Sequence, residues 1–125
     1  MSPRILAIDD TEHLRTVLRL TLEFKGHQVQ LACDGAEALE AARKGPFDLI
    51  ICDIEMPKVD GVSFVRQYRA EFGPAVPIIM LTAEGDEKIQ QARAAGATDA
   101  IAKPFEPLHL YETVERHLSR PGAPE

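Results

Sequence analysis

The sequence predicts an α/β fold in which a five-stranded parallel sheet is covered by helices on both faces. Short apolar runs alternate with segments of helical periodicity along the whole chain, and most of the runs are too continuously apolar to have a solvent-exposed face. Each passage from a strand through a helix to the next parallel strand is right-handed, which gives a doubly wound sheet between two helical layers. The chain has 125 residues, the length of one domain.

The first half of the chain contains three predicted strands and two predicted helices. Leu14, Val17 and Leu18 recur at helical spacing, and Gly26 is a typical residue after the last turn of a helix. The turn at Asp34-Gly35 precedes an alanine-rich segment of high helix propensity. We predict strands over 5–8, 27–31 and 47–52, and helices over about 11–25 and over 36–43.

The second half contains two predicted strands and three predicted helices. Glycine followed by proline ends the third helix at Gly73, and Gly96 ends the fourth. We predict a helix from 62 to 72, a strand over 77–81, a helix that opens at 84–86, a strand over 99–102 and a final helix containing residues 108–118. Residues 1–120 are expected to form the domain, and residues 121–125 a flexible tail.

Four of the apolar strands stop on residues that phosphate chemistry can use. Asp9 and Asp10 follow the first strand, and Asp53 follows the third. Thr82 follows the fourth strand, and Lys103 follows the fifth. The carboxyl ends of parallel strands meet at one edge of the sheet, where doubly wound folds bind their ligands, so we expect these groups to converge.

This set of groups predicts a site for phosphoryl chemistry. Clustered carboxylates repel one another unless a cation joins them, and Mg²⁺ binds one or two carboxylates while leaving a position for a substrate phosphate. Asp53 is the candidate nucleophile, because aspartyl phosphates are known covalent intermediates. Lys103 can neutralise phosphoryl charge, and the hydroxyl of Thr82 can donate a hydrogen bond to a phosphoryl oxygen.

The overall charge and hydropathy exclude several other classes of protein. There are 14 basic and 20 acidic residues, a net charge of −6, and no cluster of Lys and Arg, so nucleic acid is not an expected partner. No apolar run is long enough for a membrane span or a signal peptide, which predicts a cytoplasmic protein. Cys33 and Cys52 lack metal-ligand spacing and are expected to be reduced, mostly buried thiols. The histidines share no ligand spacing and are expected outside the crevice, at the surface or half buried: His13, His27, His109 and His117.

The motifs quoted above also resemble a known family. Ile8-Asp9-Asp10, the segment D-x-x-M-P-x-x-D-G from Asp53 to Gly61, Leu81-Thr82-Ala83 and Lys103-Pro104-Phe105 are similar in order and spacing to the receiver domains of two-component response regulators. The resemblance covers nearly the whole chain. It implies a flavodoxin-like sheet with the strand order 2-1-3-4-5, the order of the chemotaxis member of this family.

The resemblance also implies roles for individual residues at a metal site. Asp53 would be the phosphoacceptor for a histidine kinase. Asp10 and Asp53 would coordinate Mg²⁺ directly, Asp9 would act through a bound water, and Glu55 would contribute its backbone carbonyl.

By the same resemblance, Thr82 and Lys103 would hold the phosphoryl group, and the Lys103-Pro104 bond would be cis. Ala100 departs from the pattern, because the family commonly has an aromatic residue at this position that changes orientation with the threonine. Glu55 and Glu84 stand at two variable positions that, by the same resemblance, would tune the lifetime of the phosphate.

The expected function is a phosphorylation-activated signalling switch, not an enzyme with a separate substrate. It would catalyse its own phosphorylation and slow dephosphorylation and would signal by protein–protein contact, as a monomer or a weak phosphorylation-dependent dimer. The expected partners are a sensor histidine kinase or phosphotransfer protein and a downstream target protein. One alternative is an intermediate phosphocarrier in a phosphorelay. The other is a Mg²⁺-dependent phosphatase that uses an aspartyl phosphate, which the adjacent placement of Asp9 and Asp10 and the lack of a capping insertion disfavour.

Overall fold

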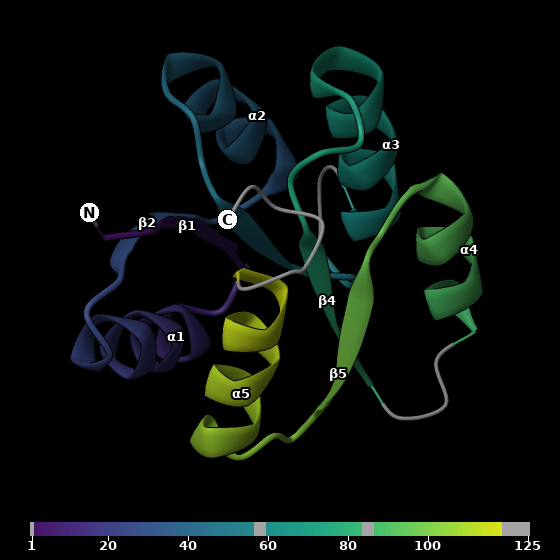
Figure 1. Cartoon of the computed structure of the whole chain (residues 1–125). Helices are drawn as coiled ribbons and strands as arrows, with labels where there is room; N and C mark the ends of the chain where they lie inside the picture. Colours follow the sequence, from purple (N-terminus) through teal and green to yellow (C-terminus); the bar gives the residue numbers. More distant parts are fainter. Residues whose placement is uncertain (1, 57–59, 84–86, 119–125) are drawn as a thin grey trace.

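The computed structural model describes residues 2–56, 60–83 and 87–118, in which strands and helices alternate along the chain (Figure 1). The strands are β1 (Arg4–Ile8), β2 (Gln28–Ala32), β3 (Leu49–Asp53), β4 (Ile78–Ala83) and β5 (Asp99–Lys103). The helices are α1 (Glu12–Phe24), α2 (Gly35–Lys44), α3 (Gly61–Phe72), α4 (Lys88–Ala95) and α5 (Pro107–Leu118).

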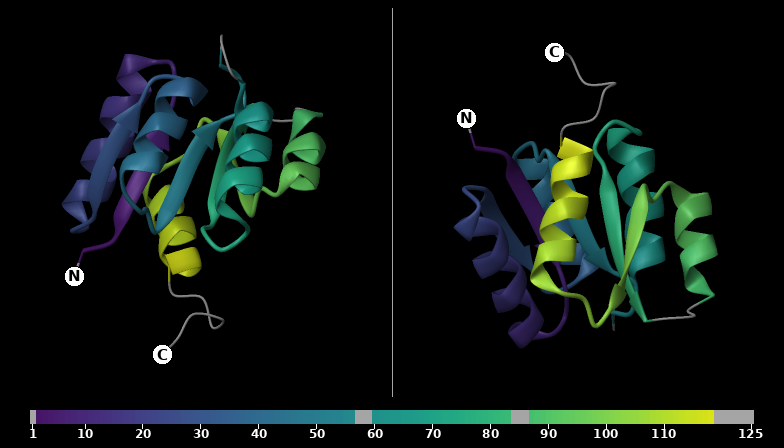
Figure 2. Two further views of the ribbon diagram at one scale, coloured as in Figure 1. Left: turned by 90° about the horizontal axis from the view of Figure 1, so that it is seen from above. Right: turned by 60° about the horizontal axis from the view of Figure 1, so that its bottom comes forward.

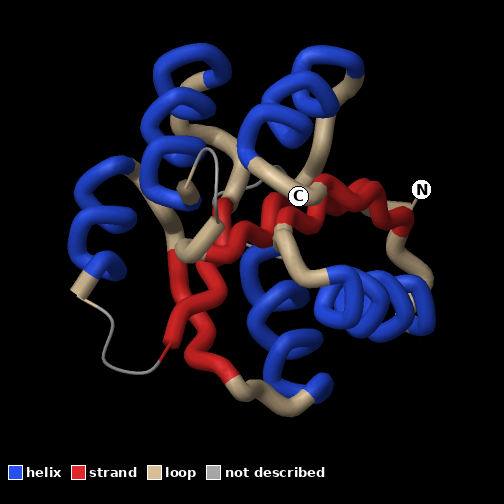
Figure 3. The backbone as a smooth tube through the Cα atoms, turned by 180° about the vertical axis from the view of Figure 1, so that it is seen from behind, coloured by secondary structure: helices blue, strands red, loops and turns tan. Residues whose placement is uncertain are grey.

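The strands form one parallel sheet in the order β2-β1-β3-β4-β5, which confirms the predicted order. Helices α1 and α5 cover one face, and α2, α3 and α4 cover the other (Figures 1 and 2). The view from behind shows the strands between these two helical layers (Figure 3). The fold is therefore the doubly wound arrangement that the alternation of elements predicts, with the flavodoxin-like strand order that the resemblance implies.

Each strand of the sheet interior sends alternate side chains into two separate cores. On β1, Leu6 and Ile8 pack into the core under α2, α3 and α4, whereas Ile5 and Ala7 pack into the core under α1 and α5. Because both faces of the sheet are covered, β3 is buried along its whole length, as expected for a central parallel strand. Successive side chains of a strand point to opposite faces of the sheet, so neighbouring residues of one strand pack into different cores.

Local capping explains where several helices begin and end. The Asp34 carboxylate accepts a hydrogen bond from the Glu37 N–H at 2.8 Å at the start of α2. Asp60 accepts from the Ser63 N–H at 2.8 Å at the start of α3. Gly96 ends α4 with a φ of 120°, a conformation that residues with a Cβ rarely adopt.

Some predicted boundaries and exposures were wrong. Strands β3, β4 and β5 continue to Asp53, Ala83 and Lys103, because parallel pairing with the neighbouring strand extends that far. His27 is buried, not half buried, because it packs against α5, where its Nε2 lies 2.6 Å from Glu115 Oε2. Cys33 is exposed, and only Cys52 is buried, because residue 33 lies in the turn that follows β2; both thiols are free.

Some predicted features lie outside the described residues. These are the 84–86 opening of the fourth helix, the position of Glu84 within it, and the tail over 121–125. Of the helices that are described, none is both long and apolar enough to cross a membrane.

Candidate functional site

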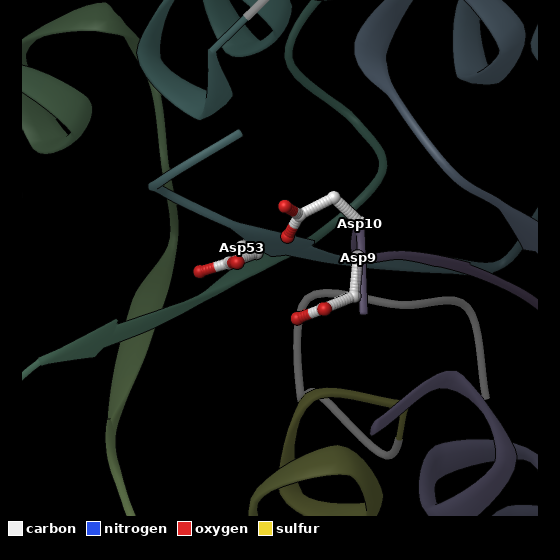
Figure 4. A group of neighbouring side chains, drawn as sticks. All are labelled: Asp9, Asp10 and Asp53. Atoms are coloured by element: carbon white, nitrogen blue, oxygen red, sulfur yellow. The ribbon is translucent and has the colours of Figure 1, made fainter. Parts of the chain in front are cut away.

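The predicted site residues converge at the carboxyl edge of the sheet. Pairing between β1 and β3 ends at Ile8 and Cys52, so the next residues, Asp9 and Asp53, lie at the same level of these adjacent strands. Figure 4 shows that the side chains of Asp9, Asp10 and Asp53 gather at this edge. Their ligand oxygens all lie within 4.8 Å of one another, close enough to share one cation.

The two carboxylates after β1 differ in their surroundings. Asp9 is fully buried, and its Oδ1 accepts a hydrogen bond from the Thr11 N–H at 2.8 Å. Its other oxygen, Oδ2, accepts no hydrogen bond from the described residues. Asp10 is exposed. A buried carboxylate oxygen that accepts no hydrogen bond is costly unless something else binds it, so Asp9 Oδ2 is a suitable ligand for a cation or its bound water.

Asp53 is 3% exposed at the end of β3. Its Oδ1 lies 3.1 Å from Lys103 Nζ and accepts a hydrogen bond from the Glu55 N–H at 3.3 Å. Burial and the negative charge of Asp9 raise the pKa of Asp53 to about 6, against the opposing effect of Lys103. Near neutral pH Asp53 is therefore mostly an anion, and a bound cation would favour that form further.

Lys103 reaches the acidic cluster from the far edge of the sheet. It ends β5, and its Nζ also lies 3.8 Å from Asp9 Oδ2. The Lys103-Pro104 peptide bond is cis, as the resemblance predicted. The lysine side chain remains 31% exposed, so its ammonium lies at the boundary between the acidic cluster and solvent.

Thr82 lies in the last part of β4 and is buried. Its hydroxyl donates a hydrogen bond to the Ala83 carbonyl oxygen at 3.1 Å. A single χ1 rotation can redirect a threonine hydroxyl, so Thr82 holds a donor at this edge of the sheet.

A glycine at the start of α3 fixes how closely that helix approaches the end of β3. A Cβ on Gly61 would lie 2.3 Å from the Asp53 carbonyl oxygen and 2.7 Å from Ile54 Cα. The Gly61 N–H donates a hydrogen bond to the Ile54 carbonyl at 2.9 Å. Only glycine fits this contact between two backbones, and the contact holds α3 against the end of β3, where Asp53 lies.

A cleft of about 500 Å³ leads from the solvent to Asp53. It is lined by residues of α1, of the strand ends and of the loop after β5: His13, Leu14, Val17, Asp53, Glu55, Ala83, Lys103, Pro104 and Phe105. The expectation that the histidines lie outside the crevice was therefore wrong for His13. Its position three residues after Asp10, in the first turn of the helix that leaves this edge, is the signal that could have placed it there.

Two further contacts at the site had no signal in the sequence. Arg15 of α1 donates from Nη1 to the Asp9 carbonyl oxygen at 2.6 Å, and Lys88 Nζ of α4 lies 3.1 Å from Glu55 Oε2. Both depend on how a helix packs against the sheet edge.

Comparison with known proteins agrees with this geometry. The family model of the response regulator receiver domain matches residues 5–115. The chain belongs to this family. The receiver domain is 39% identical over 118 residues to the transcriptional regulatory protein ResD of Bacillus subtilis, with 94% of this chain and 48% of ResD covered. It is 40% identical over 118 residues to the response regulator MprA of Mycobacterium leprae, with 94% and 51% covered. The chain thus spans about half the length of these relatives.

Solved structures resemble the receiver domain over nearly its whole length. The chemotaxis protein CheY4 of Vibrio cholerae has a TM-score of 0.88 and 41% identity, with 93% of this chain and 98% of CheY4 covered. The receiver domain of the sensor histidine kinase PA1611 of Pseudomonas aeruginosa has a TM-score of 0.88 and 34% identity, with 96% and 100% covered. In the PA1611 structure a magnesium ion is coordinated in the active-site cleft.

The residues of this receiver domain fit such an ion. Three carboxylates supply hard oxygen ligands within 4.8 Å of one another, and buried Asp9 Oδ2 lacks a hydrogen-bond partner among the described residues. The acidic cluster of Asp9, Asp10 and Asp53 is therefore compatible with Mg²⁺ binding.

Proposed function

We propose that this receiver domain accepts a phosphoryl group on Asp53 from a phosphorylated histidine of a kinase or phosphotransfer protein. The observation that carries the proposal is the position of Asp53, with a carboxylate cluster on one side and the Lys103 ammonium 3.1 Å away on the other. Charges of both signs around a nucleophilic carboxylate are what phosphoryl transfer needs from a protein.

In the proposed reaction, a carboxylate oxygen of Asp53 attacks the phosphorus atom of the phosphohistidine. The P–N bond breaks, its electron pair leaves on the imidazole nitrogen, and that nitrogen takes up a proton. Lys103 neutralises negative charge on the phosphoryl oxygens, and the Thr82 hydroxyl donates a hydrogen bond to one of them. Slow attack by water on the phosphorus of the acyl phosphate then breaks the bond to the Asp53 oxygen, releases inorganic phosphate and returns Asp53 to its free carboxylate.

We assign the proposed metal ligands to the acidic cluster. Asp10 and Asp53 would coordinate Mg²⁺ through their side chains, Asp9 would bind through a water, and the Glu55 carbonyl would complete the set. Mg²⁺ bound there would neutralise charge on the phosphoryl oxygens and on the carboxylates.

The output is proposed to be binding to another protein, by a monomer or a weak phosphorylation-dependent dimer. The alternatives of a relay phosphocarrier and of an aspartyl-phosphate phosphatase are not favoured by any contact in the site. A location in the cytoplasm stays a prediction.

The proposal is tested by incubation with acetyl phosphate and Mg²⁺, followed by borohydride trapping and peptide mass spectrometry. We expect one phosphorylated residue, Asp53. Asp53→Asn should remove the label. Asp34→Asn is the control: residue 34 caps α2 away from the site, asparagine is also a good helix cap, and this variant should retain the label. Full labelling of the Asp53→Asn variant would contradict the assignment.

A further inference from the structure

Glu55 connects the candidate phosphoacceptor to helix α4. Its backbone N–H donates to Asp53 Oδ1 at 3.3 Å, so the residue is fixed beside the carboxylate. Glu55 lines the cleft that leads to Asp53. Its carboxylate oxygen Oε2 lies 3.1 Å from Lys88 Nζ. Lys88 is the first residue of α4. Glu55 therefore contacts both the Asp53 carboxylate and α4, a helix that carries none of the acidic cluster.

The negative charge of Glu55 affects the approach of a phosphoryl donor, because Glu55 lines the cleft that leads to Asp53. Asp9, Asp10 and Asp53 already place three carboxylates at this edge, and Glu55 adds another at the entrance. A phosphoryl donor is itself an anion, so each uncompensated carboxylate in the cleft repels it. The ammonium of Lys88 compensates the Glu55 carboxylate and holds it toward α4.

We propose that Lys88 is a positioning residue for phosphorylation of Asp53, and that it acts through Glu55. In this assignment Lys88 does not touch the reacting atoms. It keeps the Glu55 carboxylate neutralised and turned toward α4, so that an anionic phosphodonor enters the cleft with less repulsion. The inference rests on the proposed function and names a residue on a different helix that regulates the same site.

Partial exposure sets the size of the expected effect. The side chains of Lys88 and Glu55 are 42% and 58% exposed. Charge pairs of this kind have modest energies that salt screens. We therefore expect changes in rate of about two- to fivefold.

The experiment measures initial rates of phosphorylation by acetyl phosphate, at subsaturating donor and fixed Mg²⁺, by mass spectrometry of the intact protein. Six proteins are compared: the wild type, Lys88→Gln, Lys88→Arg, Glu55→Gln, the double variant Glu55→Gln/Lys88→Gln, and Arg43→Gln. Arg43 forms an exposed ion pair with Glu71 at 2.8 Å, between α2 and α3, and is the matched control.

Lys88→Gln should be phosphorylated about two- to fivefold more slowly than the wild type, because an unpaired Glu55 carboxylate repels the donor. Lys88→Arg should restore the rate. In the Glu55→Gln background, Lys88→Gln should change nothing, because the carboxylate through which Lys88 acts is gone. The difference between the wild type and Lys88→Gln should shrink at high salt, and Arg43→Gln should match the wild type.

Two outcomes overturn the inference. A Lys88→Gln rate equal to the wild-type rate removes any role for Lys88. An equal slowing in both backgrounds means that Lys88 acts by its own charge and not through Glu55. Both outcomes require a wild-type protein that is phosphorylated on Asp53, whereas a wild type without that modification contradicts the proposed function itself.

Discussion

Lys103 Nζ lies 3.1 Å from Asp53 Oδ1, although β4 separates the two strands that carry these residues. The contact depends on the position of both residues at the carboxyl ends of their strands, where the lysine side chain can cross above β4. It places one cation directly against a buried carboxylate whose neighbour, Asp9, is also buried. The positive charge of Lys103 therefore offsets part of the negative charge of Asp9 and Asp53, and several measurable properties should depend on these charges.

The first prediction concerns metal binding. Asp10→Ala should weaken Mg²⁺ binding at least about tenfold, because it removes one carboxylate of the acidic cluster. The same change should raise the melting temperature of the metal-free protein, because it relieves repulsion within the cluster. The chain has no tryptophan, so titration calorimetry and the Mg²⁺-dependent shift in melting temperature are suitable measurements. Glu12→Ala, at an exposed acidic residue next to the cluster, is the control; an Asp10→Ala titration equal to that of the wild type would count against the site.

The second prediction is that the metal-free protein loses stability as the pH rises through about 6. In the folded protein the pKa of Asp53 is raised from the usual 3.8 to about 6, by burial and by Asp9. Between these values the folded state binds the proton more tightly than the unfolded chain does, so raising the pH disfavours folding, in total by about 3 kcal/mol. Urea unfolding in EDTA from pH 4 to pH 8 measures this effect. Asp53→Asn should abolish the Asp53 contribution, and an identical pH profile in that variant would contradict the prediction.

The third prediction concerns Asp99, at the start of β5, whose effect on stability changes with pH in the opposite direction to that of Asp53. Partial burial opposes its ionisation, but hydrogen bonds from His117, the Ala100 N–H and Arg116 outweigh burial and hold the pKa of Asp99 below its usual value. Its contribution to stability is therefore present at neutral pH and is lost as the pH falls below about 4.

Asp99→Asn should destabilise the protein by about 1–2 kcal/mol at pH 7 and by less at pH 3, where part of the carboxylate's contribution is already lost. Urea unfolding at the two pH values tests the difference. Glu40→Gln, at an exposed position, should change stability little at either pH. A loss in Asp99→Asn that is the same at both pH values would be inconsistent with a role for the ionised carboxylate.

The fourth prediction concerns the backbone contact under Asp53. Gly61→Ala should destabilise the fold by at least about 2 kcal/mol, because the new methyl group would lie 2.3 Å from the Asp53 carbonyl oxygen, and neither backbone can move easily. It should also slow phosphorylation, since relief of the clash displaces the end of β3, which carries Asp53. Gly45→Ala is the control, because its methyl group would meet only the flexible Arg4 side chain at 3.0 Å. Equal stability of the two variants would contradict the role of Gly61.

The fifth prediction concerns the response to phosphorylation. By the family resemblance, Ala100 stands where an aromatic residue would report the signal, so we expect Thr82 and α4 to carry the change. Of the residues of α4, only Ala92 is buried, which makes this helix easier to displace than the others. Amide exchange with and without beryllofluoride, a mimic of the phosphoryl group, should change most at residues 82–92 and less at 111–118. A largest change on α1, or none at full occupancy, would contradict this switching surface.

The sequence by itself determined the elements, their order and the identity of the reactive groups. Short, continuous apolar runs such as Ile50-Ile51-Cys52, bounded by turn signals, predict strands covered on both faces, and the helical segments between them favour parallel pairing. Parallel pairing brings all the strand ends to one edge, so the convergence of Asp9, Asp53 and Lys103 followed from residue type and position.

The tertiary structure alone decided which side chains complete the site and how they are charged. The contact between Lys88 and Glu55, and the entry of His13 into the cleft, depend on the packing of α4 and α1 against the sheet. The raised pKa of Asp53 likewise depends on burial and on the distance to Asp9. Periodicity in a sequence fixes which face of an element is buried, whereas distances between elements depend on the packing of all side chains together.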